Sequence, residues 1–248
     1  MKISIITAVW NNRETIADAI ESVLSQTYSD AEYIIIDGGS TDGTVDIIRS
    51  YGDRITKFVS EKDKGIYDAL NKGVKLATGD VIGFLHSDDV FADENSVAKI
   101  AEAFSENTDG VYSDLIYTPK SDITKILRYW ESRSFTPELL SRGWMPAHPT
   151  LYLRREIYDR FGMFDLNFRI AADYDFILRV FTSGINTVYI PEVLYKMRLG
   201  GASNKSLKNI IRKSREDYIA LRNNGVGGLG TLFIKNISKL GQFFKYNK

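Results

Sequence analysis

The sequence of 248 residues has no cysteine, only two histidines, and no uninterrupted apolar run that approaches the ~18 residues needed to span a bilayer. The lack of cysteine excludes a disulfide framework and a thiolate metal site, so a bound metal must use oxygen or imidazole ligands. A reducing compartment is compatible with this composition. The N-terminal stretch MKISIITAV is too short for the apolar core of a signal peptide and predicts a strand. We therefore expect a globular protein without a transmembrane segment.

The formal net charge is zero, but the charges are unevenly placed. Between residues 205 and 248 ten Lys and Arg stand against only Glu216 and Asp217, so this last segment is basic. Either an anionic membrane surface or the rest of the domain could cover a basic amphipathic helix there, and the sequence leaves both open. The apolar residues that recur at helical spacing near its end are Leu232, Phe233, Ile237, Leu240 and Phe244.

Strand and helix patterns alternate through the first half of the chain. Short β-rich runs bounded by turn residues precede segments in which apolar residues recur every three or four positions. This order predicts right-handed crossovers and a parallel sheet that is buried on both faces. The strands are expected at 3–9, 33–36, 57–59 and 81–85. The first helix is expected to be capped by Asn12 and to run to Leu24, and the later helices are expected at 44–48, 66–76 and 96–104.

Carboxylates follow three of these strands. Asp37 comes after the second, Asp63 after the third, and the adjacent pair Asp88 and Asp89 after the fourth. Ligands bind beyond the carboxyl ends of such strands, and carboxylates gathered there repel each other unless a cation or a donor-rich ligand offsets their charge. Hard oxygen ligands favour Mg²⁺ or Mn²⁺, which bridge phosphates. The alternative for the pair is an Asp-rich turn that caps the next helix.

Six motifs in order resemble the family 2 glycosyltransferases of the GT-A fold, in particular the bacterial branch that builds capsule, exopolysaccharide or O-antigen chains. They are SIITAVWNN, SVLSQTY, IIIDGGSTDGT, EKDKGIYDALNKG with ATGD, FLHSDD and AADYDFILR, within residues 2–201. The resemblance implies an α/β fold with a Rossmann-like mixed sheet flanked by helices. It also implies a domain over 1–204, with a nucleotide-binding half (1–110) and an acceptor half (111–204), before a helical tail over 205–248.

The resemblance further implies inverting transfer of a sugar from a nucleotide diphosphate sugar, with UDP the expected nucleotide, to an acceptor hydroxyl. Asp37 matches the carboxylate that binds the base, and Ala8 and Trp10 match the loop beside it. Uracil offers an N3–H donor to a carboxylate, and an indole face can stack on the ring. The alternative for Trp10 is a large hydrophobe that closes the core. Asp88 is matched to the ribose or the sugar, and Asp89 to the metal.

The motif EKDKGIYDALNKG departs from the family pattern, because Leu70 stands where an arginine is usual. The phosphate contact then falls to Lys64 or Lys72. By the same resemblance we expect Asp63 and Asn71 to line the donor site.

An inverting displacement needs a base that takes the proton of the acceptor hydroxyl. Asp173 sits where the family places its catalytic aspartate, and the glutamate that often precedes it is Ala172. Asp175 is the alternative base. For Asp175 we favour another role, that of a carboxylate in the first helical turn that complements the helix dipole.

The acceptor region is expected over 113–142 and the following GWMPAHPTLYLR, where aromatic and basic side chains suit sugar rings or an ordinary packed loop. His148 resembles a position near the family's active site, and His86 replaces a usual asparagine, where a hydrogen-bonding role is favoured over metal ligation. The aromatic and basic residues are Tyr117, Arg128, Tyr129, Trp130, Arg133 and Trp144.

The resemblance implies a glycan or polyprenyl-diphosphate-linked acceptor and a cytoplasmic enzyme, at the inner face of the cytoplasmic membrane if the tail binds lipid. We expect no nucleic-acid partner, and the oligomeric state is not predicted. Two alternatives remain, a sugar-1-phosphate nucleotidyltransferase and a carbohydrate-binding module without activity. TAVWNNRET lacks the Gly-rich basic loop of the first, and no motif carboxylate is missing as the second would require. DGGSTDG lacks the G-x-G-x-x-G spacing of a dehydrogenase.

Overall fold

The structure of the chain, a computed structural model, describes residues 1–200 and 207–238. Its first four strands are parallel and alternate with helices, as the sequence predicts. One detail is wrong: Asn12 does not cap the first helix, and its amide instead donates to Ser87 Oγ at 2.9 Å. The elements are β1 (Ile3–Val9), α1 (Ile16–Leu24), β2 (Ala31–Asp37), α2 (Thr44–Ser50), η1 (Gly52–Arg54), β3 (Lys57–Ser60), α3 (Ile66–Leu76) and β4 (Val81–Phe84).

The second half extends the same sheet and makes it mixed, which confirms the predicted α/β architecture. The strand order is β3-β2-β1-β4-β8-β6-β9-β5, with β7 beside β6, and β8 runs antiparallel to both β4 and β6. Its elements are β5 (Val90–Phe91), α4 (Ser96–Glu102), β6 (Gly110–Thr118), β7 (Arg128–Trp130), α5 (Pro137–Ser141), η2 (His148–Thr150), β8 (Tyr152–Arg154), α6 (Arg155–Phe161), α7 (Ala172–Phe181) and β9 (Thr187–Arg198).

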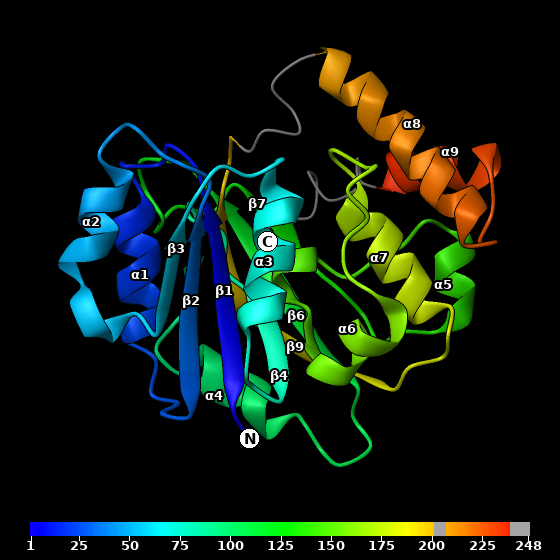
Figure 1. The fold of residues 1–248 in the computed structure, drawn as a ribbon. Coiled ribbons are helices and arrows are strands. Elements are labelled where there is room, and N and C mark those ends of the chain that lie inside the picture. The colour runs from blue at the N-terminus through cyan, green and yellow to red at the C-terminus, as the bar shows by residue number, and fades with distance from the viewer. Residues whose placement is uncertain (201–206, 239–248) are drawn as a thin grey trace.

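The parallel strands are buried on both faces because their side chains alternate between two apolar clusters. On β1, Ile6 and Ala8 join the cluster that includes residues of α3 and α7, whereas Ile5 and Val9 join the cluster that includes residues of α1. This alternation explains the continuous apolar run of β1, since neither face of the strand meets water. Helices cover both sides of the sheet, and the strand ends are left to the loops (Figure 1).

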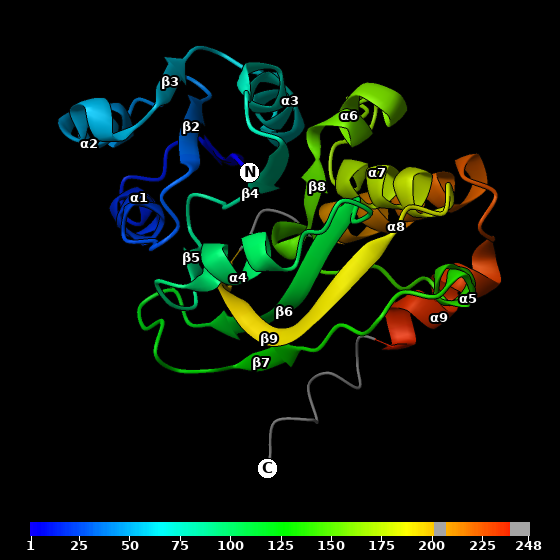
Figure 2. The same ribbon diagram turned by 90° about the horizontal axis from the view of Figure 1, so that it is seen from below.

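Two further helices follow the sheet, α8 (Leu207–Asn223) and α9 (Leu229–Ser238), which confirms a helical C-terminal region. Figures 1 and 2 show α8 against α7 and α9 beside α5. Lys235 of α9 is only 2% exposed, pairs with Asp217 of α8 at 2.8 Å, and lies over the ring of Tyr174 in α7. This face of the tail therefore packs on the domain. The predicted apolar positions Leu240 and Phe244 lie outside the described residues.

Within the described ranges, no helix has both the length and the apolar character that crossing a bilayer requires.

Candidate functional site

Asp37 ends β2 at the carboxyl edge of the parallel strands. Its Oδ2 accepts hydrogen bonds from the backbone N–H groups of Gly39 and Ser40, both at 3.0 Å, and from Ser60 Oγ at 2.6 Å. Its Oδ1 is buried and has no hydrogen-bond partner among the residues that the structure describes. Since a buried carboxylate oxygen without a partner is costly, Oδ1 is suited to accept a bond from a ligand donor.

Trp10 lies beside this carboxylate edge, in the loop after β1, and its side chain is 67% exposed. The alternative that it closes the core is therefore wrong. The next residue, Asn11, adopts a positive φ of 47° and ties the loop to its neighbour: its N–H donates to Ser40 Oγ at 2.7 Å, and its side-chain oxygen accepts from Thr41 N–H at 2.8 Å. An exposed indole on a fixed loop is available for stacking, while Ala8 is buried in β1 behind it.

Asp63 belongs to the loop after β3 and approaches the loop after β2 closely. A Cβ on Gly38 would stand 2.4 Å from Asp63 Oδ2, so a larger residue there would displace the Asp63 carboxylate from its present position. The other oxygen of Asp63 accepts from Gly65 N–H at 2.8 Å. Lys64 is exposed at this turn, whereas the Lys72 ammonium is 2.8 Å from Glu61 and is thereby partly neutralised. Of the two predicted phosphate contacts, Lys64 is the more accessible.

The adjacent carboxylates after β4 have different surroundings. Asp88 is partly exposed, whereas Asp89 is 1% exposed and its Oδ1 accepts from Arg198 N–H at 3.0 Å. Burial, reinforced by the charge of Asp88, raises the pKa of Asp89 well above its usual value. The Oδ2 of Asp89 is buried and has no hydrogen-bond partner among the described residues. Asp88 is thus the carboxylate of the pair that faces the open edge.

Two histidines, the buried His148 and the partly buried His86, lie between the carboxylates that follow β4 and the one on α7. The rings of His86 and His148 lie 6.0 Å apart, and both feel the charge of Asp173, while His86 also feels Asp88. Burial lowers the pKa of His86 and lowers that of His148 to about 4, so both imidazoles are neutral at pH 7. The structure therefore brings Asp88 and Asp173, which are 85 positions apart in sequence, to one site.

Asp173 is partly exposed in the first turn of α7 and is hydrogen-bonded to Tyr67 of α3. The Tyr67 hydroxyl lies 3.0 Å from Asp173 Oδ1 and 2.7 Å from the carbonyl oxygen of Ile170. Burial, followed by the charge of Asp173, raises the pKa of Tyr67 well above its usual value, so the phenol keeps its proton. Asp173 combines access with a fixed position, as a base requires.

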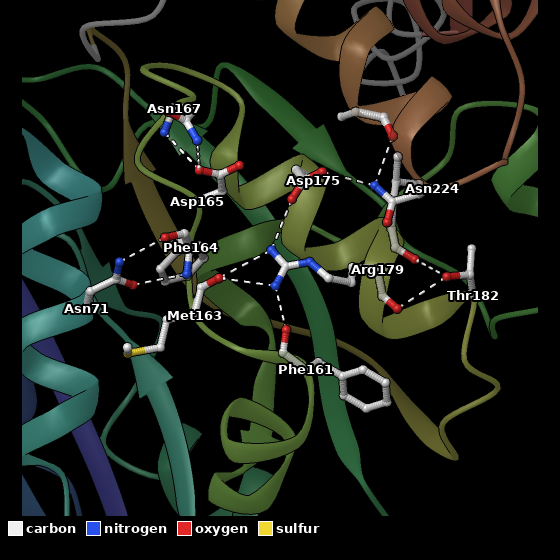
Figure 3. Close-up of polar contacts among 12 residues, drawn as sticks. Asn71, Phe161, Met163, Phe164, Asp165, Asn167, Asp175, Arg179, Thr182 and Asn224 are labelled. Atoms are coloured by element: carbon white, nitrogen blue, oxygen red, sulfur yellow. Dashed lines mark hydrogen bonds and ion pairs between the residues drawn. The ribbon is translucent and has the colours of Figure 1, made fainter.

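The side chains of Asp175 and Asn71 are occupied by contacts within the protein (Figure 3). Asp175 is two residues from Asp173, so it projects from another face of α7, where it pairs with Arg179 at 3.0 Å and accepts from Asn224 at 3.0 Å. These bonds favour a structural role over that of the alternative base. The Asn71 amide is buried and pairs with the backbone N–H and C=O of Phe164. This pairing favours a structural role for Asn71 over the predicted contact with the donor, which stays a prediction.

The aromatic residues of the acceptor half divide into packed and accessible groups. Trp144 is partly buried and packs against Phe135 and Phe181 at the edge of the apolar core, which favours a structural role. The Arg128 guanidinium lies over the rings of Tyr117 and Trp130, 4.9 and 5.8 Å from their centroids. This stack is partly exposed and flanks the buried Asp89 side of the site, because Tyr117 feels the charge of Asp89. It remains a candidate surface for a sugar ring.

Sequence reasoning missed Tyr67 and Arg198. Tyr67 is hydrogen-bonded to Asp173, 106 positions away in the sequence, and Arg198 is hydrogen-bonded to Asp89, 109 positions away. Arg198 also donates through Nη1 to the carbonyl of Asp88 at 2.8 Å, which fixes the turn that carries both carboxylates. A lone arginine at the end of a strand gives no local signal of such a contact.

The residues at this edge fit a divalent ion held partly by a ligand. No group of three or more His, Asp or Glu side chains that could hold a metal occurs in the part of the chain that the structure describes. Mg²⁺ and Mn²⁺ need no such cage, because they bind through one or two carboxylates together with phosphates and waters. The partly exposed Asp88 beside the unpaired Oδ2 of Asp89 matches that donor set.

Comparison with known proteins identifies relatives of this chain. A relative from Mycobacterium tuberculosis, "PGL/p-HBAD biosynthesis glycosyltransferase", is 31% identical over 208 residues, which cover 81% of this chain and 78% of the relative. A second relative, from Escherichia coli, is 31% identical over 217 residues, which cover 86% of this chain and 84% of the relative. It is "UDP-Glc:alpha-D-GlcNAc-diphosphoundecaprenol beta-1,3-glucosyltransferase WfaP".

The fold is also that of a solved enzyme, the mannosyltransferase PcManGT from Pyrobaculum calidifontis in complex with GDP-Man and Mn²⁺. The TM-score is 0.68 at 18% identity, over 97% of this chain and 70% of that one. The sequence model of "Glycosyl transferase family 2" matches residues 4–186, which run from the second residue of β1 past the end of α7 and include every strand-end carboxylate described above. This chain therefore belongs to the family 2 glycosyltransferases.

Proposed function

We propose that the protein is an inverting glycosyltransferase that moves a sugar from a nucleotide diphosphate sugar to an acceptor hydroxyl, with Asp173 as the base. One observation carries this proposal. The partly exposed Asp173 stands apart from the carboxylates at the strand ends, and two neutral histidines, His86 and His148, lie between them. In this arrangement, different side chains bind the donor and take the proton from the acceptor. The family supports transfer, and neither a nucleotidyltransferase nor a silent binding module has comparable support.

The nucleotide binds at the ends of β1 to β3 in this proposal. The unpaired Oδ1 of Asp37 accepts a base N–H, Trp10 stacks on the base, and Lys64 contacts the diphosphate. Asp63 lines the same loop. UDP is the proposed nucleotide, supported by the UDP-Glc in the name of the E. coli relative.

The proposed metal is Mn²⁺ or Mg²⁺, supported by the Mn²⁺ bound to the P. calidifontis enzyme. Geometry favours Asp88 as the direct ligand, because it is the more exposed carboxylate, with the buried Asp89 behind it; the sequence-based assignment of the metal to Asp89 stays a prediction. A metal bound there offsets the charge of the leaving diphosphate.

In the proposed reaction the acceptor oxygen attacks the anomeric carbon from the face opposite the diphosphate. The new C–O bond forms as the bond to the β-phosphate oxygen breaks, and that oxygen leaves with the electron pair. The acceptor proton passes to an oxygen of Asp173. Burial lowers the pKa of His86 and of His148, so both imidazoles accept a proton less readily than a free histidine, and the proposal gives the base role to Asp173.

The proposed acceptor is a glycan on a polyprenyl diphosphate in surface polysaccharide synthesis, supported by the diphosphoundecaprenol in the name of the E. coli relative. Such an acceptor places the enzyme at a cytoplasmic membrane surface. The outer faces of α8 and α9 support this proposal, because both expose large apolar side chains, and those of α8 stand among basic residues such as Lys208 and Arg215. The exposed apolar residues are Ile210, Ile211, Leu229, Phe233, Ile234 and Ile237.

Transfer is tested by incubating the protein with Mn²⁺ and a panel of UDP-, GDP- and dTDP-sugars and measuring release of the nucleoside diphosphate. Nuclear magnetic resonance of the product then reports the anomeric configuration. We expect slow, metal-dependent hydrolysis of one donor and an inverted anomer. Retention of configuration would contradict the inverting proposal, and binding without any turnover under all conditions would favour the silent module.

A further inference from the structure

Glu216 of α8 makes an unusual contact with the segment that leads into α7. It is 8% exposed, and its Oε2 accepts hydrogen bonds from three successive backbone N–H groups, those of Arg169, Ile170 and Ala171, at 3.1, 2.8 and 3.0 Å. Glu216 lies beyond residues 4–186, which the family sequence model matches. A residue outside the matched family region thus holds part of the candidate site.

The start of α7 needs such a partner. The N-cap residue of α7 is Ala171, whose methyl group cannot accept a hydrogen bond. Of the three N–H groups that Glu216 binds, that of Ala171 belongs to this helix end, and those of Arg169 and Ile170 lie just before it. A carboxylate is the best acceptor at this end, because it also complements the helix dipole. The segment before α7 is therefore held by a side chain from a helix 45 residues later.

The held segment controls the surroundings of Asp173. The Tyr67 hydroxyl has one proton and two acceptors within reach, the carbonyl of Ile170 at 2.7 Å and Asp173 Oδ1 at 3.0 Å. Glu216 fixes the N–H of Ile170, and the same residue's carbonyl competes with Asp173 for the phenol proton. Movement of this segment would therefore change both the direction of the Asp173 side chain and its hydrogen bonding.

We infer that Glu216 is a positioning residue for transfer, which acts on Asp173 through the backbone of residues 169–171 and the Tyr67 hydroxyl. This inference rests on the proposed role of Asp173. It makes α8 a working part of the active site rather than an appended tail. Donor binding, at the ends of β1 to β3, should not depend on it.

The test compares Glu216→Ala and Glu216→Gln with wild type. Glu216→Ala should lower kcat by about 10-fold or more, because small displacements of a reacting group are costly, and change KM for the donor less than about 2-fold. Glu216→Gln keeps an acceptor oxygen and should recover part of the loss. The matched control is Asp217→Asn, which disturbs the adjacent buried carboxylate and its pair with Lys235 but does not touch residues 169–171. All assays are run below the unfolding temperature of each variant.

A double-mutant cycle separates positioning from a general loss of structure. In an Asp173→Asn background, Glu216→Ala should have little further effect on kcat, because its target is already removed. An equal fold-loss in both backgrounds, or an equal loss from Asp217→Asn, would overturn the inference. Folded Glu216→Ala with wild-type kcat would also overturn it, whereas full activity of Asp173→Asn would instead contradict the proposed base.

Discussion

The two sides of the site are held in different ways. On the donor side Asp37 is fixed mostly by its own loop, through backbone N–H groups two and three residues along the chain. On the base side Asp173 is fixed by Tyr67, which is 106 residues away, and its helix is held by Glu216. The loop of Asp37 is thus held largely by contacts that are close in sequence, whereas Asp173, like the Asp88–Asp89 turn fixed by Arg198, depends on contacts more than 100 residues away.

This difference has a functional consequence. Substitutions among the strand-end loops should change nucleotide or metal affinity and leave the base in place. Substitutions around α7 should change turnover and leave affinity intact. The variants below test that separation, from the largest expected effect to the smallest.

The largest effect is expected at the metal. Asp88→Asn should abolish the Mn²⁺-dependent gain in UDP affinity and lower transfer by about 10³-fold, because it removes the accessible charged ligand. Asp89→Asn should keep part of that gain, since the Asp89 side chain is buried against Arg198. Calorimetric titration with UDP, with and without Mn²⁺, measures both. Loss of the metal gain only in Asp89→Asn would return the ligand role to Asp89.

A change at Asp37 is expected to reverse the preference of the protein for uracil over cytosine in the nucleotide. In Asp37→Asn the amide oxygen can keep the bonds to Gly39 and Ser40, which turns the NH₂ group toward the ligand in place of the unpaired Oδ1. UDP affinity should fall about 10-fold or more, whereas CDP, whose N3 is an acceptor, should bind better than to wild type. Ser60→Ala is the control that leaves Oδ1 in place. An unchanged ratio of UDP to CDP affinity would contradict the role of Asp37.

The contrast between the two sides also explains what the sequence could predict. The parallel strands and the position of Asp37 at a strand end were predictable because turn residues and apolar periodicity are local, whereas the expected contacts of Asp37 and Trp10 with the nucleotide came from the family resemblance. Tyr67 and Glu216 were not predictable, because a tyrosine in a helix and a glutamate in a basic tail have no signal until the fold brings α3, α7 and α8 together. The antiparallel insertion of β8 beside β4 was predictable only through the family resemblance, since its short run fits several pairings.

The buried histidine gives a pH-dependent effect of intermediate size. His148 has its pKa lowered to about 4 by burial, so between about pH 6.5 and pH 4 the unfolded chain binds a proton that the folded chain does not. The free energy of unfolding should therefore fall with pH across this window, by roughly 2–3 kcal/mol from this residue. His148→Phe, which preserves the stacking on Phe84, should flatten that slope. Equal slopes in urea titrations of both proteins would show that His148 titrates normally.

The smallest effect is expected at the tail. Truncation after Gly225 would remove Lys235 and leave Asp217 buried without this ion pair, so point substitutions are the cleaner test. Phe233→Ser with Ile237→Ser should weaken co-sedimentation with anionic vesicles at low salt by about 3-fold, while transfer to a short soluble acceptor is unchanged. Leu166→Ser, another exposed apolar position, is the control. Equal sedimentation of all three proteins would contradict a membrane-facing tail.

The most direct test of the whole account is the turnover of Asp173→Asn with donor and acceptor saturating, beside that of Asp175→Asn. The account predicts a loss of about 10²-fold or more in kcat for Asp173→Asn with UDP affinity unchanged, because the amide cannot accept the proton. Asp175→Asn should lose far less, and what it loses should follow its lower stability, since its carboxylate pairs with Arg179. Wild-type turnover in Asp173→Asn, or a greater loss in stably folded Asp175→Asn, would contradict the assignment of the base.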